Sequence, residues 1–333
     1  MKNLKNNKFF IMFFLLAILI LTSTVGKAES VLKVSTPPDP NSLPLLLLYA
    51  NQDEWLEETK IEIQMSPSGD PGATRALIHS KKADLVLFSS FSGAKFFTEG
   101  EKDLRLLGTH VWKGVYLLAR EDINAWEKID GKRGLAIPGN NTPPHILAKK
   151  SLLKHDAKVD FSGMGGGAAL WTALSKENSQ VQAVALPEPM VSRILLKQKE
   201  ENWPVKYKIF ADPQKELNPE TGKLPLGSLF LTDDSLAETK KEEINDFIKG
   251  FNKAIKQINT SNPEKTVEFL VPTWKEVFNQ KLPPQLFKTV LDSDRLELDF
   301  KPAPQIRETN KSFWKKYFDL KVSNKFFCEN LYE

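Results

Sequence analysis

Short apolar or alternating runs recur along the first two thirds of the chain, each followed by a polar or Gly/Pro-rich turn and a helix-forming stretch. The alternating run Ile61–Met65 (IEIQM) is typical of a half-buried strand, whereas Ala83–Phe88 (ADLVLF) is typical of a parallel strand buried on both faces. The strands predicted in this way are 31–35, 61–65, 83–88, 133–137, 158–161, 182–186 and 206–210. This repeated strand–loop–helix order predicts doubly wound α/β sheets with all strand ends opening on one side.

Capping residues and prolines mark the predicted helix starts. Asp70 and Thr142 each stand at a predicted N-cap, and each is followed by a proline at the first helical position, where the missing N–H costs nothing. The predicted helices are 44–51, 71–80, 143–155, 168–176, 190–199, 240–259, 263–270 and 311–318. The last of these lies close to the C-terminus, and no solenoid repeat or low-complexity tract accompanies them.

The stretch Asp130–Ile146 (DGKRGLAIPGNNTPPHI) reads as a strand, a turn and a helix start. Such a helix start would point several unpaired backbone N–H groups and the positive end of the helix dipole beyond the strand's carboxyl end. Small ligands dock there in open α/β sheets, and anions suit that position best. The alternative is an ordinary capped turn without a ligand.

Two segments resemble one another. Residues 114–123 and 227–236 each begin with glycine, continue as a mostly apolar strand, and end in acidic residues and an aliphatic one. We interpret them as adjacent strands flanking an insertion, that is, as the two crossings of a hinge. Chance similarity of two ordinary strands is the alternative, because strand patterns are short.

The first 28 residues have the pattern of a secretory signal. A Lys- and Asn-rich start precedes the apolar run Phe9–Leu21, which is too short for an ordinary membrane span, and small residues favour cleavage after Ala28. An uncleaved anchor is the alternative. The segment contains four lysines and no acidic residue, so it accounts for the whole formal net charge of +4, and the mature chain is formally neutral. A neutral chain without a Lys/Arg block argues against a nucleic-acid surface.

The only cysteine is Cys328, which excludes an intramolecular disulfide, a Cys-based zinc cage and a lipid-bearing cysteine just after the signal. An exported, unanchored chain of this kind is expected in the periplasm. The four histidines show no metal-ligand spacing, no Gly-x-Ser-x-Gly elbow is present, and Gly165-Gly166-Gly167 lacks the lysine of a phosphate-binding loop. We therefore expect no catalytic residues, no metal and no cofactor.

Three stretches, taken in order, carry a resemblance to a known family. They are 129–154 (IDGKRGLAIPGNNTPPHILAKKSLLK), 181–196 (VQAVALPEPMVSRILL) and 242–270 (EEINDFIKGFNKAIKQINTSNPEKTVEFL). Together with the export signal, they make the chain resemble, over about residues 31–310, a type II periplasmic substrate-binding protein of an ABC importer, in the nitrate/sulfonate/taurine and thiamine-precursor group. The loop after Ser35 departs from the family by being Pro-rich rather than Gly-rich, and residues 323–333 match nothing in it.

This resemblance implies two doubly wound α/β lobes joined by a two-strand hinge. The implied limits are 1–28 for the signal peptide, 31–119 with 226–310 for lobe 1, 120–212 for lobe 2, and 311–333 for a C-terminal helix and tail. It also implies that a monomer captures a small solute between closing lobes and delivers it to permease subunits in the inner membrane. The expected solute is a sulfonate, a nitrate-like anion or a pyrimidine-type vitamin precursor.

Candidate ligand contacts lie in the loops at strand ends. They are Thr36, Ser66, Ser68, Asp70, Phe88, Ser89, Ser90, Phe91 and Trp112 in the first lobe, and Asn140, Asn141, Thr142, Gly165, Gly166 and Glu188 in the second. Hydroxyls, amides and backbone N–H groups hold an oxyanion without a buried countercharge. Trp112 is either a wall of the cleft or a core residue, Glu188 either binds a ligand or caps a helix, and Arg75 either pairs with a ligand carboxylate or lies on a solvated face.

Two other classes of function stay open at this stage. One is an enzyme on the same scaffold, of the pyrimidine-precursor synthase or menaquinone-pathway type, against which the export signal argues. The other is a periplasmic sensor module that signals instead of feeding a transporter. Turnover assays would reveal an enzyme, and neighbouring permease and ATPase genes would indicate an importer.

Overall fold

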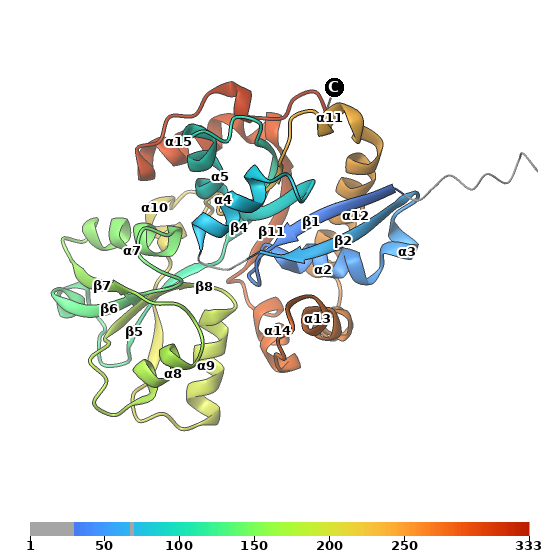
Figure 1. Ribbon diagram of the computed structural model, residues 1–333. Coiled ribbons are helices and arrows are strands. Elements are labelled where there is room, and N and C mark those ends of the chain that lie inside the picture. The colour runs from blue at the N-terminus through green and yellow to red at the C-terminus, as the bar shows by residue number, and fades with distance from the viewer. Residues whose placement is uncertain (1–29, 67–69, 333) are drawn as a thin grey trace, which may run out of the picture. The chain divides into compact units, whose positions relative to one another are not determined.

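The computed structural model describes residues 30–66 and 70–332, and the chain from Val31 onward forms one compact unit. The predicted signal peptide (1–28) and the candidate residue Ser68 lie outside the described residues. The secondary structure divides into two separate sheets, which we name sheet A and sheet B (Figure 1).

Sheet A has six strands in the order β11-β4-β10-β3-β1-β2. Their bounds are β1 Ser30–Thr36, β2 Thr59–Met65, β3 Leu85–Ser89, β4 Arg105–Lys113, β10 Gly227–Leu231 and β11 Glu297–Pro302. β1 runs parallel to β3, whereas β10 is antiparallel to β3 and β4, and β11 is antiparallel to β4. Sheet A is therefore a mixed sheet in which strands from both ends of the chain are neighbours.

Helices cover both faces of sheet A. Their bounds are α2 Ser42–Ala50, α3 Gln52–Trp55, α4 Pro71–His79, α5 Ser90–Thr98, α11 Leu236–Thr239, α12 Lys241–Thr260, α13 Pro263–Phe278, α14 Pro284–Leu291, α15 Ala303–Phe318 and the 3₁₀ turn η1 Asn324–Phe326. α2 packs with α12 and α13, while α5 packs with α15 in a separate group against β3, β4 and β10 (Figure 1). Both helix groups bury apolar side chains against the strands.

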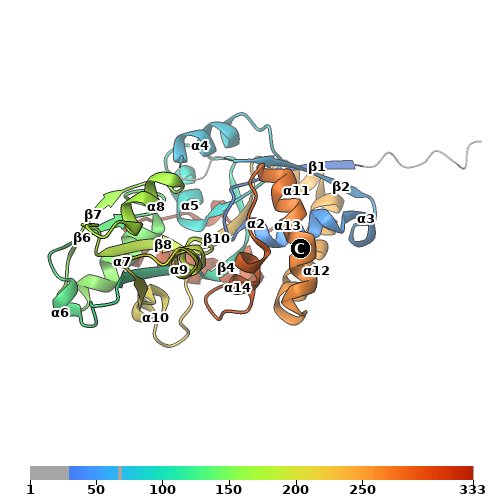
Figure 2. The same cartoon turned by 90° about the horizontal axis from the view of Figure 1, so that it is seen from below.

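Sheet B has five strands in the order β7-β6-β8-β5-β9. The bounds are β5 Val115–Arg120, β6 Lys132–Ala136, β7 Val159–Gly163, β8 Ala183–Pro187 and β9 Tyr207–Ala211. The helices between them are α6 Trp126–Ile129, α7 Pro143–Leu153, α8 Ala168–Ser175, α9 Met190–Glu200 and α10 Pro213–Leu217. α8 and α9 bury one apolar cluster on sheet B, and α6 and α7 bury a second one, so both faces are covered (Figures 1 and 2).

The prediction of two α/β sheets with helices on both faces is confirmed, and each of the strands predicted from the sequence is present within two residues at either end. The interpretation of 114–123 and 227–236 as adjacent strands is wrong. β5 pairs with β8 and β9 in sheet B, whereas β10 pairs with β3 and β4 in sheet A. Their likeness reflects that both are buried strands that follow a glycine, a pattern too short to specify a partner.

The chain passes between the sheets at two places. The first is Gly114, between β4 and β5, and the second is the segment 212–226, between β9 and β10. Residues 115–119, which the sequence analysis assigned to the first lobe, are hydrogen-bonded in sheet B. The strands β4 and β11 and the helix α14 were not predicted: the two strands become regular by pairing with their neighbours, and α14 is a short amphipathic helix in a Pro-rich region.

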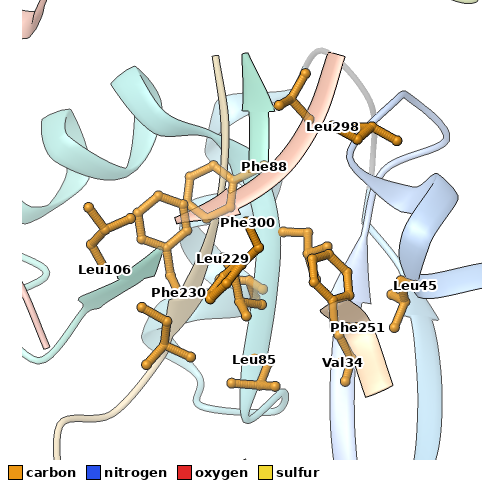
Figure 3. Packing of buried hydrophobic residues seen from close by; sticks show 14 of the residues in the cluster. Val34, Leu45, Leu85, Phe88, Leu106, Leu229, Phe230, Phe251, Leu298 and Phe300 are labelled. Carbon is orange, nitrogen blue, oxygen red and sulfur yellow. The ribbon is translucent and has the colours of Figure 1, made fainter. Parts of the chain in front are cut away.

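The core of sheet A is rich in aromatic side chains (Figure 3). The rings of Phe88 and Phe230 lie 4.6 Å apart between centroids, and Phe251 and Phe300 meet edge to face at 6.1 Å. The C-terminal tail joins this core, since Phe326, Phe327 and Cys328 are buried and the Cys328 N–H donates to the Leu106 carbonyl at 2.9 Å. The tail that matches no family pattern is therefore an integral part of the fold.

We expect Phe326→Ala to destabilise the protein by about 3–5 kcal/mol, because this ring is fully buried against Phe97, Phe230 and Trp314 and its loss leaves a cavity. The matched control is Phe269→Ala on the exposed side of α13, which should cost less than about 1 kcal/mol. Urea denaturation followed by circular dichroism measures both. Equal losses for the two variants would contradict a structural role for the tail.

Candidate functional site

A cavity of about 160 Å³ lies where loops that follow strands of sheet A face strand ends of sheet B. From sheet A and its helices it is lined by Pro37, Asp39, Pro40, Asn41, Ser66, Asp70, Thr74, Phe88, Ser89, Ser92, Phe96, Val111, Leu226 and Gly227. Gly114, at the first passage between the sheets, and Val115, Pro138, Thr142, Pro143, Pro144 and Pro187 complete the lining. Strand ends and helix starts are the usual place for a ligand in an α/β fold.

The loop after β1 supplies the most distinctive polar groups. Asp39 Oδ1 accepts hydrogen bonds from the backbone N–H and the side-chain Nδ2 of Asn41, both at 2.8 Å, and the Asp39 carbonyl accepts from Ser42 N at the start of α2. Desolvation raises the pKa of Asp39 to about 6, against which the two hydrogen bonds from Asn41 act. The loop therefore holds a carboxyl group in place at the cavity wall.

Asn41 is buried, and its Oδ1 has no hydrogen-bond partner among the described residues. This oxygen lies against Gly227, where an added Cβ would stand 1.9 Å from it. Glycine at 227 is thus required for Asn41 to reach its position. A buried acceptor without a donor is unusual in a folded protein.

Helix starts on the sheet A side are already capped. Asp70 is the N-cap of α4, as predicted, and accepts from Ala73 N at 3.0 Å. Ser89 is the N-cap of α5 and accepts from Ser92 N at 3.4 Å, while Ser90 N donates to the Leu226 carbonyl. These bonds occupy N–H groups that an anion would otherwise use.

The sheet B wall begins with the helix start that the sequence analysis singled out. Thr142 stands at the N-cap of α7, but its hydroxyl donates to the Gly139 carbonyl at 2.6 Å and accepts no hydrogen bond from the helix. Pro143 and Pro144 occupy the first two helical positions, and neither has an N–H. The expectation that this helix start offers several N–H groups is therefore wrong, because the second proline removes one more donor.

The charged side chains of the cavity lining are all acidic. Asp39 and Asp70 carry the only ionisable side chains among the described lining residues, and no Lys, Arg or His is among them. Hydroxyl groups of Ser66, Thr74 and Ser92 add polar surface. The remaining wall consists largely of Phe88, Phe96 and proline rings, so the cavity combines acceptors with flat apolar surfaces.

Five of the predicted site residues line the cavity, namely Ser66, Asp70, Phe88, Ser89 and Thr142. The others that the structure describes lie elsewhere: Thr36, Ser90, Phe91, Trp112, Asn140, Asn141, Gly165, Gly166 and Glu188. Buried Ser90 donates to the Pro225 carbonyl, Phe91 stacks on Phe318 at 4.0 Å, and the buried Trp112 donates to the Asp299 carbonyl at 2.6 Å. Asn140, Asn141, Gly165 and Gly166 are exposed near the ends of β6 and β7, and Thr36 Oγ1 contacts the Pro37 carbonyl at 3.4 Å.

Sequence reasoning missed the Asp39–Asn41 pair, together with Thr74, Ser92, Phe96 and Gly227. The signal for Asp39 and Asn41 was present, since their loop directly follows a predicted strand, but its Pro-rich composition departs from the resembling family. Thr74, Ser92 and Phe96 lie inside helices, where nothing in the sequence marks the side that faces the cavity. Arg75 pairs with Glu101 at 2.9 Å and lies outside the lining.

Glu188 is fully buried in a polar network outside the cavity. Its Oε1 accepts from Arg295 Nε at 2.6 Å, and its Oε2 accepts from Ser192 N at 3.0 Å in the first turn of α9. Arg295 also donates to Ser192 Oγ at 2.7 Å. Because Arg295 lies between α14 and β11, this network ties the start of α9 on sheet B to the chain that enters sheet A.

The chain has the fold of known periplasmic binding proteins. It is similar to the periplasmic aliphatic sulphonate-binding protein SsuA from Escherichia coli, with 19% identity, a TM-score of 0.68, and coverage of 91% of this chain and 99% of that one. It is also similar to the ligand-binding component of an ABC-type import system from Staphylococcus aureus, solved with zinc bound, with 13% identity, a TM-score of 0.68, and coverage of 91% of this chain and 98% of that one. An ABC transporter protein from Parabacteroides distasonis is similar with 17% identity, a TM-score of 0.66, and coverage of 90% of this chain and 99% of that one. No protein-family model and no curated protein sequence matches the chain.

Within the part of the chain that the structure describes, no group of three or more His, Cys, Asp or Glu side chains is arranged to hold a metal ion. None of the helices in that part has the length and apolar character needed to span a bilayer.

We expect Arg295→Met to destabilise the protein by about 3–5 kcal/mol, because it leaves the buried Glu188 carboxylate without its counter-ion. The double variant Glu188→Gln/Arg295→Met should recover part of this loss, since it removes the unpaired charge. Arg120→Met, which breaks the more exposed pair with Asp122, should cost less than about 1 kcal/mol. Urea unfolding at pH 7.5 measures all three, and a double variant less stable than Arg295→Met would argue against a charge-pair role.

Proposed function

We propose that this protein is the extracytoplasmic solute-binding component of an ABC-type import system, which captures a small molecule in the cavity and delivers it to a membrane permease. The observation that carries this proposal is the cavity, because its lining comes from strand ends of both sheets. The solved structures to which the chain is similar over nearly its whole length include a ligand-binding component of an ABC-type import system and a periplasmic aliphatic sulphonate-binding protein, which supports the same class of function.

Capture would follow from the way the chain joins the two sheets. Only Gly114 and the segment 212–226 connect β4 to β5 and β9 to β10, and Gly114 itself lines the cavity. A ligand that touches both walls gains contacts in a closed arrangement that an open one lacks, so it shifts the population toward closure. On this basis we propose a lobe built on sheet A and a lobe built on sheet B, with the division at Gly114 and in 212–226.

The predicted signal peptide supports a periplasmic location, with permease subunits in the inner membrane as partners of a monomer. The absence of a nucleophile–base pair among the described lining residues supports a binding role without catalysis, since none of them is His, Cys or Lys. A sensor module would capture its ligand in the same way, and uptake measurements in cells that lack the gene would separate the two roles.

The ligand classes expected from the sequence differ in how they fit this cavity. A sulfonate or nitrate-like anion needs donors, and the starts of α4, α5 and α7 at the cavity carry prolines or side-chain caps, while at the start of α2 the Ser42 N–H donates to the Asp39 carbonyl. A small flat heterocycle finds Phe88, Phe96 and the proline rings as apolar walls. The proposal therefore favours a compact organic solute over an inorganic anion.

We expect at least one member of a panel of alkylsulfonates, nitrate, carboxylates, primary amines and pyrimidines to raise the melting temperature of the mature protein. A ligand at 100 times its Kd stabilises the folded state by about 2.7 kcal/mol, which corresponds to a shift of roughly 3–5 °C for a protein of this size. Ser92→Trp should abolish this shift, because the indole would fill much of the cavity.

The matched control is Ser162→Trp, at an exposed position of β7 outside the cavity, which should keep the ligand-induced shift. Differential scanning fluorimetry followed by calorimetry measures the shift and the affinity. A panel without any hit, or a shift that survives Ser92→Trp, would contradict binding in this cavity. Conversion of the bound compound into a product would indicate an enzyme instead.

A further inference from the structure

We propose that the solute bound in this cavity is a small organic amine, held as an ammonium cation by the carboxylate of Asp39, and not an oxyanion. This inference rests on the proposed solute-binding function and names the chemical class of its ligand. Four features of the cavity carry it: unused acceptors, uncompensated negative charge, missing donors and flat apolar walls.

The acceptors are the first feature. Both hydrogen bonds from Asn41 go to Oδ1 of Asp39, so the second carboxylate oxygen of Asp39 is left for a further donor. Asn41 Oδ1, on a side chain that is 93% buried, has no partner among the described residues. The Asp39 carboxylate therefore offers an acceptor at the cavity wall, with the buried Asn41 amide behind it, and an ammonium group donates up to three hydrogen bonds.

The charge is the second feature. Asp39 and Asp70 line the cavity without a Lys, Arg or His among the described lining residues. Asp70 uses its carboxylate to cap α4, whereas Asp39 caps no helix through its side chain. Asp39 is partly buried, where a carboxylate without a cation is costly, and desolvation, opposed by the two hydrogen bonds from Asn41, raises its pKa to about 6. A cationic ligand would supply the missing counter-ion.

The shortage of donors is the third feature. Pro143 and Pro144 have no N–H at the start of α7, and Ser92 N and Ala73 N are taken by the caps of α5 and α4. Thr142 donates its hydroxyl proton to the Gly139 carbonyl. An oxyanion would therefore meet two carboxylates, with the hydroxyls of Ser66 and Ser92 as donors in place of backbone N–H groups, an arrangement that disfavours it.

The size and walls of the cavity are the fourth feature. A volume of about 160 Å³ is close to that of an engineered apolar cavity of about 150 Å³ that holds benzene. Phe88, Phe96 and the proline rings form flat apolar surfaces beside Asp39 and Asn41. The ligand is thus expected to combine an ammonium group with a compact apolar body of about one ring.

We expect the ionisation of Asp39 to be the main source of pH dependence in ligand binding, given the charged and titratable groups around it. Asp70 at the start of α4 lines the same cavity. His110 on β4 contacts the Asn41 carbonyl at 3.2 Å, and burial lowers its pKa to about 4, so it stays neutral above pH 5. On α7, burial and the nearby Lys149 lower the pKa of His145, whose Nδ1 accepts from Asn141 N at 2.9 Å. Lys113, next to Gly114, donates to the Asp294 carbonyl and faces Asp212.

The test compares three probes that share a benzyl body: benzylamine, benzyl alcohol and phenylmethanesulfonate. Isothermal titration calorimetry on the mature protein at pH 7.5 should give at least tenfold tighter binding for benzylamine than for phenylmethanesulfonate. The ammonium group of benzylamine forms a charged hydrogen bond with Asp39, whereas the sulfonate is repelled by the carboxylates of the cavity. Benzylamine affinity should fall roughly tenfold at pH 5, since about one in eleven Asp39 carboxyls is ionised one unit below a pKa of about 6.

Asp39→Asn should weaken benzylamine binding roughly tenfold or more, remove most of its pH dependence, and leave benzyl alcohol nearly unaffected. The asparagine keeps an oxygen to accept from Asn41, and a melting curve without ligand checks that the variant folds. Asp122→Asn, at an exposed carboxylate after β5 that does not line the cavity, is the matched control and should change none of the three affinities.

Tighter binding of the sulfonate than of every amine in the panel, with loss of that binding in Ser92→Trp, would overturn the amine assignment and leave the solute-binding function intact. Benzylamine binding that is unchanged in Asp39→Asn would also overturn it. Failure of all three probes and of the whole panel would instead remove the solute-binding proposal on which the assignment depends.

Discussion

The candidate site depends on one geometric constraint: strands from two separate sheets bring their ends to the same cavity. In sheet A, β1, β2 and β3 each end next to it, and in sheet B the ends of β6 and β8 do so. Parallel strands connected by helices place their following loops at one edge, so residues far apart in the sequence converge there. Gly114 belongs both to the passage between the sheets and to the cavity wall.

Two acidic residues near strand ends have contrasting surroundings. Glu188 follows β8 and is neutralised by Arg295 and by donors in the first turn of α9, so its charge is used within the fold. Asp39 follows β1 and, among the described residues, its carboxylate receives the two donors of Asn41, with no Lys, Arg or His in the cavity lining. The first carboxylate stabilises the join between the sheets, whereas the second is left available to a ligand.

Prolines define the chemistry of the cavity as much as the acidic residues do. They start α4 and α7 at its edge and line it at Pro37, Pro40, Pro138 and Pro187. Each removes a backbone donor, and the rings of those that line the cavity add rigid apolar faces. A site that in many α/β proteins would hold an anion at a helix start is here poor in donors and rich in acceptors.

The sequence by itself determined the local elements. Alternating and apolar runs located the strands, the Asp70 cap located the start of α4, and their order predicted two doubly wound sheets. It also placed Ser66, Phe88 and Ser89 at strand ends, which is where the cavity lies. These features are predictable because capping and strand periodicity depend on neighbouring residues only.

Only the tertiary structure decided which strands pair and which loops meet. In the structure β5 and β10 belong to different sheets, and Phe326 of the tail lies in the core. Glu188 pairs with Arg295, which is 107 residues away. It also turned Ser90 and Trp112 toward backbone carbonyls and left Asp39 and Asn41 at the wall. Such outcomes depend on packing between distant segments, and a single sequence does not record which of its side chains will face one another across a cavity.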